Sequence, residues 1–169
     1  MDNYNYTYSD TELDIILKKE FWKLLKAGLI IDARNGGLML GPSIEQGGID
    51  CVAETAAGFM KIGKIEGGVF IVNSLANKNY SEKLQAFNAY DVLFLEDEPV
   101  DYIISPTTCV YNTFGNDNKL VWLRGDEFIM NKYASFKFLK EIEEINYFDF
   151  RVWLLKGCRL QVTSCRLQG

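Results

Sequence analysis

The sequence predicts a single α+β domain with a mainly antiparallel sheet and about three helices. Short segments that alternate apolar and polar residues between glycine turns predict strands. Other segments place apolar residues at helical spacing and predict helices. The 169 residues suit one domain. We expect a polar N-terminal arm over residues 1–8, the α+β domain over 9–156 and a low-complexity tail over 157–169, where CRLQ occurs twice.

The first predicted helix begins at Ser9, because Ser9 and Glu12 match the S-x-x-E pattern of a capping box. Gly28 is a natural C-terminal stop for this helix. The turn sequence Asn35-Gly36-Gly37 follows, and 38–41 reads as a short strand. The apolar stripe of the helix consists of Leu13, Ile16, Leu17, Phe21, Leu24 and Leu25.

Residues 49–73 predict an antiparallel meander. Its strands are 49–54, 59–66 and 69–73, with turns at Gly58 and at Gly67-Gly68. A helix over about 77–89 follows.

The second half of the chain repeats this alternation of strands and a helix. Strands are predicted at 100–105, 109–114, 120–123 and 127–131. A helix covers 132–145, and FDFRVWLL at 148–155 reads as a final strand.

An internal repeat relates residues 66–91 to residues 124–149 without a gap, at an offset of 58. The shared unit is a turn glycine, a strand F-I-x-N and a helix with an aromatic residue on its buried face. The asparagine stands where its side chain can cap the free N–H groups of the helix. A structural repeat and a chance likeness between two ordinary β–α units are both open. The identical pairs are Gly67/Gly125, Phe70/Phe128, Ile71/Ile129, Asn73/Asn131, Ala76/Ala134, Asn88/Asn146 and Asp91/Asp149.

The glycine pairs do not have the setting of a phosphate-binding loop, which follows a strand and opens a helix. Gly67-Gly68 precedes a strand, and its second copy carries Asp126, which would repel a phosphate. We interpret Gly67-Gly68 as a hairpin turn, and Gly47-Gly48 likewise.

The sequence contains no histidine, which excludes Ser–His and Cys–His nucleophile pairs and histidine-containing metal sites. The four cysteines form no C-x-x-C pair, and we expect reduced thiols, with a disulfide pair as the alternative and with Cys51 and Cys109 as packing residues. Trp22, Trp122 and Trp153 are expected in the core. We assign no catalytic residue, no cofactor and no metal ligand.

The acidic segment LEDEPVD, 95–101, is the sharpest functional signal. The net charge of the chain is −5, and no Lys or Arg lies between Lys83 and Lys119. An exposed acidic patch attracts a basic partner and speeds encounter. We therefore predict that the partner-binding residues are Glu96, Asp97, Glu98 and Asp101. The alternative is a solvated acidic loop that aids solubility.

The order of the segments LMLGPSIEQGGIDCV, GKIEGGVFIVNSLANKNYSEKL and LRGDEFIMNKYASFKFLKEI resembles small bacterial immunity proteins of polymorphic toxin systems, over roughly residues 36–146. The family pattern has a Ser-His pair before E-x-GGI, whereas this chain has Ser43-Ile44, so any role of that histidine is absent. The resemblance implies a non-enzymatic protein that binds and neutralises a toxin, and a nuclease toxin would present a basic surface to LEDEPVD.

We expect a cytoplasmic protein, since the N-terminal residues do not form a signal peptide and no apolar run is long enough to span a membrane. Its partner would be a protein, with a basic toxin domain as one form of it, and not nucleic acid or a membrane. Two alternatives remain open: a hydrolase that uses carboxylates or a metal, and a structural or regulatory module that oligomerises.

Overall fold

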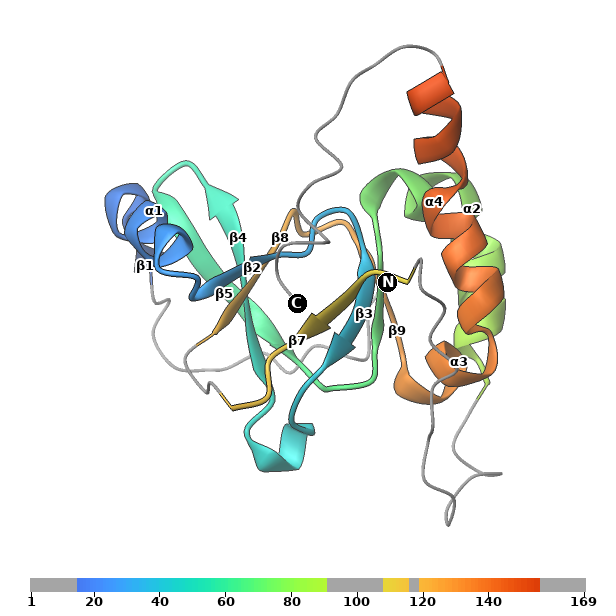
Figure 1. Ribbon diagram of the computed structural model, residues 1–169, viewed down its shortest axis with the longest axis horizontal. Coiled ribbons are helices and arrows are strands. Elements are labelled where there is room, and N and C mark those ends of the chain that lie inside the picture. Colours follow the sequence, from blue (N-terminus) through green and yellow to red (C-terminus); the bar gives the residue numbers. More distant parts are fainter. Residues whose placement is uncertain (1–14, 91–107, 116–118, 156–169) are drawn as a thin grey trace.

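The computed structural model describes residues 15–90, 108–115 and 119–155 (Figure 1), and the side chains of all of these except 148–155. The predicted N-terminal arm, the capping box of Ser9 and Glu12, the strand 100–105 and the C-terminal tail lie outside these residues. Among the described residues, no helix combines the length and the apolar character that a membrane span requires.

Two sheets form the centre of the molecule, instead of the one sheet expected. Among the described strands, four pairings are antiparallel and three are parallel. Together with the helices, these sheets confirm the α+β class. The five-stranded sheet has the order β1 (Ile15–Ile16), β5 (Gly58–Ile65), β4 (Ile49–Thr55), β8 (Leu120–Leu123), β2 (Ile30–Asp32). The four-stranded sheet has the order β7 (Val110–Asn112), β3 (Gly37–Leu40), β6 (Phe70–Val72), β9 (Phe128–Met130).

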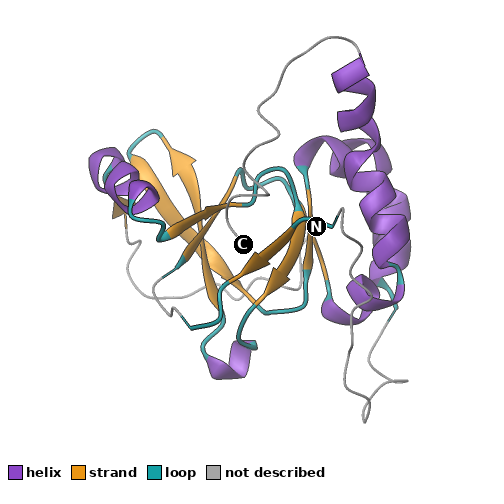
Figure 2. Ribbon diagram, in the orientation of Figure 1, coloured by secondary structure: helices purple, strands orange, loops and turns teal. Residues whose placement is uncertain are grey.

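The helices cover the outer faces of the two sheets (Figure 2). Helix α1 (Lys18–Lys26) lies on the five-stranded sheet, and α2, α3 and α4 lie together on the four-stranded sheet. The bounds of these three are Ser74–Asn88, Lys132–Lys137 and Leu139–Leu155, and a short 3-10 helix spans Ile44–Gln46. The result is four layers, in the order helix, sheet, sheet, helices.

Period-two alternation along the strands divides the core into three apolar clusters. In β8, Val121 and Leu123 face the space between the sheets, whereas Trp122 faces α1. In β6, Ile71 faces the space between the sheets, whereas Phe70 faces the helices. Strands β6 and β8 therefore bury both faces, which explains why apolar runs such as LVWL and VFIV are nearly continuous.

The internal repeat is a structural one, with approximate two-fold symmetry. Strands β6 and β9 pair antiparallel, with Ile71 opposite Ile129, its own equivalent at the offset of 58. Phe70 lies opposite Met130, and Val72 lies opposite Phe128. The helices match too: the backbone departs from helical geometry at Tyr80 inside α2 and at the equivalent Phe138 between α3 and α4.

The two strand-to-helix asparagines cap their helices as the sequence predicts. The Oδ1 atom of Asn73 accepts a hydrogen bond from the N–H of Ala76 at 2.9 Å. The Oδ1 atom of Asn131 accepts one from the N–H of Ala134 at 2.8 Å. Each bond satisfies one of the N–H groups that the first turn of a helix leaves without a partner.

A second pair of asparagines, Asn88 and Asn146, joins the two repeats to each other. The N–H of Asn73 donates to Asn146 Oδ1 at 2.7 Å, and the N–H of Asn131 donates to Asn88 Oδ1 at 2.7 Å. The side-chain amides of Asn73 and Asn131 donate to the carbonyl oxygens of Asn146 and Asn88, both at 2.7 Å. An asparagine in each repeat's helical segment therefore holds the start of the other repeat's helix.

Three secondary-structure predictions are wrong. Residues 15–16 are a strand paired with β5, so the predicted helix does not run through them, and α1 begins at Lys18. Residues 148–155 continue α4 rather than forming a strand. Adding residues to an existing helix is more favourable than starting one, and this outweighs the strand propensity of these residues. The helix predicted over 132–145 is divided at Phe138. Strand β2 has no counterpart among the predicted elements.

The glycine pairs are scaffold, but neither closes a hairpin. Gly67-Gly68 links the two sheets, because β5 belongs to one and β6 to the other. A Cβ on Gly67 would overlap the backbone of Gly41, so glycine is required by this close approach. Gly47 ends the 3-10 helix, and Ser43 with Gln46 forms a capping box at its start.

The cysteine prediction is partly wrong. Cys51 is a free thiol, fully buried in β4, and burial raises the pKa of its thiol. Cys109 is buried as expected, but it is disulfide-bonded, and its partner lies outside the part of the chain that the structure describes.

Candidate functional site

An aromatic–arginine cluster joins α1 to the five-stranded sheet and reaches the surface at Trp22. We define it as Phe21, Trp22, Arg34, Phe59 and Trp122. Phe21 and Trp22 come from α1, Phe59 from β5 and Trp122 from β8, and Arg34 follows the end of β2. Segments far apart in the sequence thus meet in one cluster.

The rings in this cluster fix one another's orientation. Phe21 and Phe59 stack with centroids 3.4 Å apart, and both meet the Trp122 ring edge to face. Trp22 meets Trp122 at 90°, with centroids 6.1 Å apart. Trp122 is buried, whereas Trp22 is 48% exposed, so the prediction of a core role is confirmed for Trp122 and wrong for Trp22.

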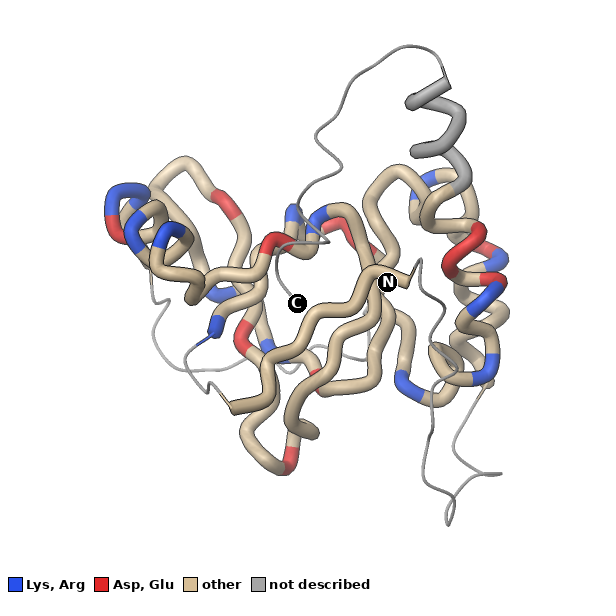
Figure 3. The backbone as a smooth tube through the Cα atoms, viewed as in Figure 1, with Lys and Arg blue, Asp and Glu red and all other residues tan. Residues whose placement is uncertain are grey.

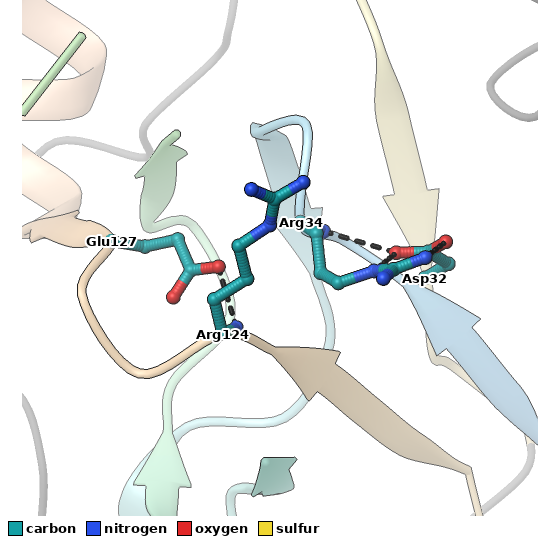
Figure 4. A network of polar contacts seen from close by, with 4 residues as sticks. All are labelled: Asp32, Arg34, Arg124 and Glu127. Carbon is teal, nitrogen blue, oxygen red and sulfur yellow. Dashed lines mark hydrogen bonds and ion pairs between the residues drawn. The ribbon is translucent and has the colours of Figure 1, made fainter. Parts of the chain in front are cut away.

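Arg34 covers the face of Trp122, and its Cζ atom lies 3.5 Å from the ring centroid. Its Nε and Nη2 atoms donate to the two oxygens of Asp32 at 2.8 and 2.7 Å (Figure 4). The hydrogen bond to Asp32 raises the pKa of the guanidinium, and the charge of Asp32 adds to this effect. Arg34 is therefore a permanent cation held in one orientation, with Nη1 taking no part in the pair with Asp32.

The turn between β8 and β9 is locked by a buried carboxylate (Figure 4). Glu127, 3% exposed, accepts hydrogen bonds from the N–H groups of Arg124 at 2.6 Å and Gly125 at 2.8 Å. Burial raises the pKa of this carboxyl, and the two N–H donors oppose that shift. This arrangement fixes a turn and leaves the Arg124 side chain exposed.

A shallow groove of about 400 Å³ lies between this turn and the first turn of α2. The Ser74 hydroxyl donates to the Asp126 carboxylate, and Asn77 Nδ2 donates to the Asp126 carbonyl at 2.9 Å. These bonds pair Ser74 and Asn77 with Asp126 across the groove. The residues that line it are Ser74, Leu75, Asn77, Lys78, Arg124 and Asp126.

Buried polar atoms gather where α4 meets the start of β7. Thr108 Oγ1, Glu143 Oε1 and Tyr147 OH are buried, and none of the three forms a hydrogen bond of good geometry with a residue that the structure describes. Burial raises the pKa of the Glu143 carboxyl, and it also raises the pKa of Tyr147 to about 12. In the sequence, Thr108 directly follows residues 91–107, which lie outside the described part of the chain.

The predicted partner-binding residues Glu96, Asp97, Glu98 and Asp101 also lie outside the described residues. Arg34 was not predicted from the sequence. An arginine that stands two residues after an aspartate at the end of a short strand is only a weak signal of a functional residue. Nothing in the local sequence showed that this arginine would lie over a tryptophan 88 positions away. Within the described ranges, no group of three or more Cys, Asp or Glu side chains is arranged to hold a metal ion.

Comparison with known proteins found no family model, no curated protein and no solved structure that matches the chain.

Proposed function

We propose that this chain is a non-enzymatic binding protein of the immunity type, which neutralises a cognate toxin in the cytoplasm. The observation that supports it best is Trp22, a large aromatic side chain exposed on a rigid setting and adjoining the stacked Trp122–Arg34 pair. Tryptophan and arginine are the residue types most enriched at the energetic centres of protein interfaces. An anchor whose rotamer is already fixed loses little entropy on binding.

The sequence adds two further supports. The resemblance to immunity proteins over residues 36–146 implies a protein partner. The acidic segment adds a second contact, in which Glu96, Asp97, Glu98 and Asp101 meet a basic toxin surface.

The test is co-purification of the chain with the product of the adjacent gene. Charge reversal of Glu96, Asp97, Glu98 and Asp101 is expected to weaken the complex and to reduce its dependence on salt. A matched control reverses four glutamates that are exposed elsewhere on the chain: Glu45, Glu82, Glu141 and Glu144. The acidic contact is refuted if reversal of Glu96, Asp97, Glu98 and Asp101 leaves binding unchanged or weakens it no more than the control does. The proposal of a toxin partner is refuted if the two proteins do not associate.

A further inference from the structure

The outward face of α1 carries a positive charge that stands out against the acidic chain. The helix holds four lysines and one glutamate, whereas the whole chain has a net charge of −5. Figure 3 shows these lysines gathered on α1, at one edge of the molecule. The residues Lys19, Trp22, Lys23 and Lys26 follow the spacing i, i+3, i+4, i+7, which places them along one side of the helix. We call this side, together with Arg34, the Trp22 face.

Part of this charge has no counter-ion on the described chain. Lys18 pairs with Glu54 at 3.1 Å, and Lys23 pairs with Glu20 at 3.0 Å. Lys19 and Lys26, on either side of Trp22 along the helix, form no ion pair with any residue that the structure describes. An exposed aromatic ring flanked by unpaired ammonium groups suits a partner that offers both carboxylates and an apolar side chain.

Arg34 extends the face beyond the helix. Its side chain is about one-third exposed, and its pair with Asp32 uses Nε and Nη2. The Nη1 group can therefore donate to a further carboxylate while the guanidinium stays stacked on Trp122.

We infer that the Trp22 face binds an acidic segment of a protein partner, with an apolar side chain of that segment packed on Trp22 and its carboxylates on Lys19, Lys26 and Arg34. The inference rests on the proposed function in taking the partner to be a protein, and it uses the same exposed ring of Trp22. It concerns a contact distinct from the acidic one described above.

An anionic membrane is a poorer match for this face. An interfacial helix lays its apolar side into the lipid, but the apolar residues of α1 pack against the five-stranded sheet: Phe21 is fully buried, and Leu24 and Leu25 pack around it. A nine-residue helix with its apolar side covered presents a single large ring outward.

The experiment follows the indole N–H signals in the ¹⁵N–¹H spectrum of the full chain. The Trp22 signal is assigned by its loss in Trp22→Phe. The probe is an acidic peptide of alternating Glu and Asp with a central Phe, and a second peptide replaces that Phe by Gly. We expect the Phe peptide to shift the Trp22 signal saturably, to bind more tightly than the Gly peptide, and to weaken about tenfold between 50 and 500 mM salt.

Charge-reversal variants locate the contact. The double variant Lys19→Glu/Lys26→Glu is expected to weaken binding of the Phe peptide about tenfold. The matched control Lys78→Glu/Lys140→Glu changes exposed lysines on α2 and α4, and it is expected to leave the affinity within twofold. These lysines are exposed and unpaired among the described residues, so folding is retained and circular dichroism checks it. Equal weakening by both pairs, or no shift of the Trp22 signal, overturns the inference. Binding to phosphatidylserine vesicles without binding to the peptide overturns it in favour of a membrane.

The same variants separate this inference from the proposed function. If the product of the adjacent gene co-purifies equally well with Lys19→Glu/Lys26→Glu, and the peptide does not bind, the inference fails and the proposed function stands. If the peptide binds at Trp22 but the toxin does not associate, the proposed function fails and the inference stands.

Discussion

Replacing Asn146 by alanine tests the symmetric link between the two repeats. Asn146 is 1% exposed, and its side chain accepts two hydrogen bonds from Asn73, at 2.7 and 2.9 Å, and donates one to the Asn35 carbonyl at 3.1 Å. The substitution leaves the N–H of Asn73 without its acceptor, which costs about 1–3 kcal/mol for a buried donor, and it removes two weaker bonds. We expect a loss of about 3 kcal/mol in the free energy of unfolding.

The internal repeat provides a matched variant, Asn88→Ala. Asn88 makes the equivalent bonds to Asn131, at 2.7 and 3.0 Å, but it is only half-buried, so water can replace part of what is lost. We expect Asn88→Ala to lower the free energy of unfolding by about 2 kcal/mol, which is about 1 kcal/mol less than the loss expected for Asn146→Ala.

Urea unfolding measures both variants. With a slope of about 2 kcal/mol/M, the midpoints should fall by about 1.5 M for Asn146→Ala and about 1 M for Asn88→Ala, at unchanged slope. Equal midpoints for the two variants would refute the role of burial, and midpoints equal to that of the unaltered chain would refute the role of the link itself.

Three further predictions follow from the core and the turns. Glu127→Gln should make stability less dependent on pH. The raised pKa of Glu127 means that the folded chain holds this proton more tightly than the unfolded chain does, so the free energy of unfolding falls as pH rises from about 4.5 through the folded-state pKa. The urea midpoints of the variant should not show that decline. Gly67→Ala should destabilise the chain by several kcal/mol, because its Cβ would overlap the backbone of Gly41. Gly125→Ala should cost only about 1 kcal/mol, because its φ is +107° but a Cβ there would meet no neighbouring atom. Thermal unfolding compares the two variants. Phe21→Ala should cost about 3–5 kcal/mol, because the fully buried ring stacks on Phe59, and a cost under 1 kcal/mol would contradict this packing.

The repeat shows how far the sequence alone could go. The match between 66–91 and 124–149 predicted the strand, the capping asparagine and the following helix, because these depend on neighbouring residues. It also marked Asn88 and Asn146 as equivalent, but their function is to bind the asparagine of the other repeat, 43 and 73 residues away. Contacts of that separation depend on how β6 pairs with β9, which local patterns do not specify.

The wrong predictions also arise because local patterns do not specify contacts between distant parts of the chain. The strand predicted at 148–155 is helix, since its aromatic and β-branched residues extend a helix that begins at Leu139. The single predicted sheet is two sheets, because Gly67-Gly68 passes the chain from one to the other through a close backbone approach rather than a hairpin. The capping box of Ser43 and Gln46 matches the S-x-x-Q pattern, which is visible in the sequence, but it was not predicted.

By itself the sequence determined the α+β class, the positions of most strands, the capped starts of α2 and α3, and the exclusion of histidine chemistry. These follow from composition and from the periods of strands and helices, which act over a few residues. Only the tertiary structure decided that the strands form two sheets and that Trp22 is exposed while Trp122 is buried beneath Arg34. Those features depend on which faces of distant segments meet, because a strand or helix pattern shows that a face is apolar but not what covers it.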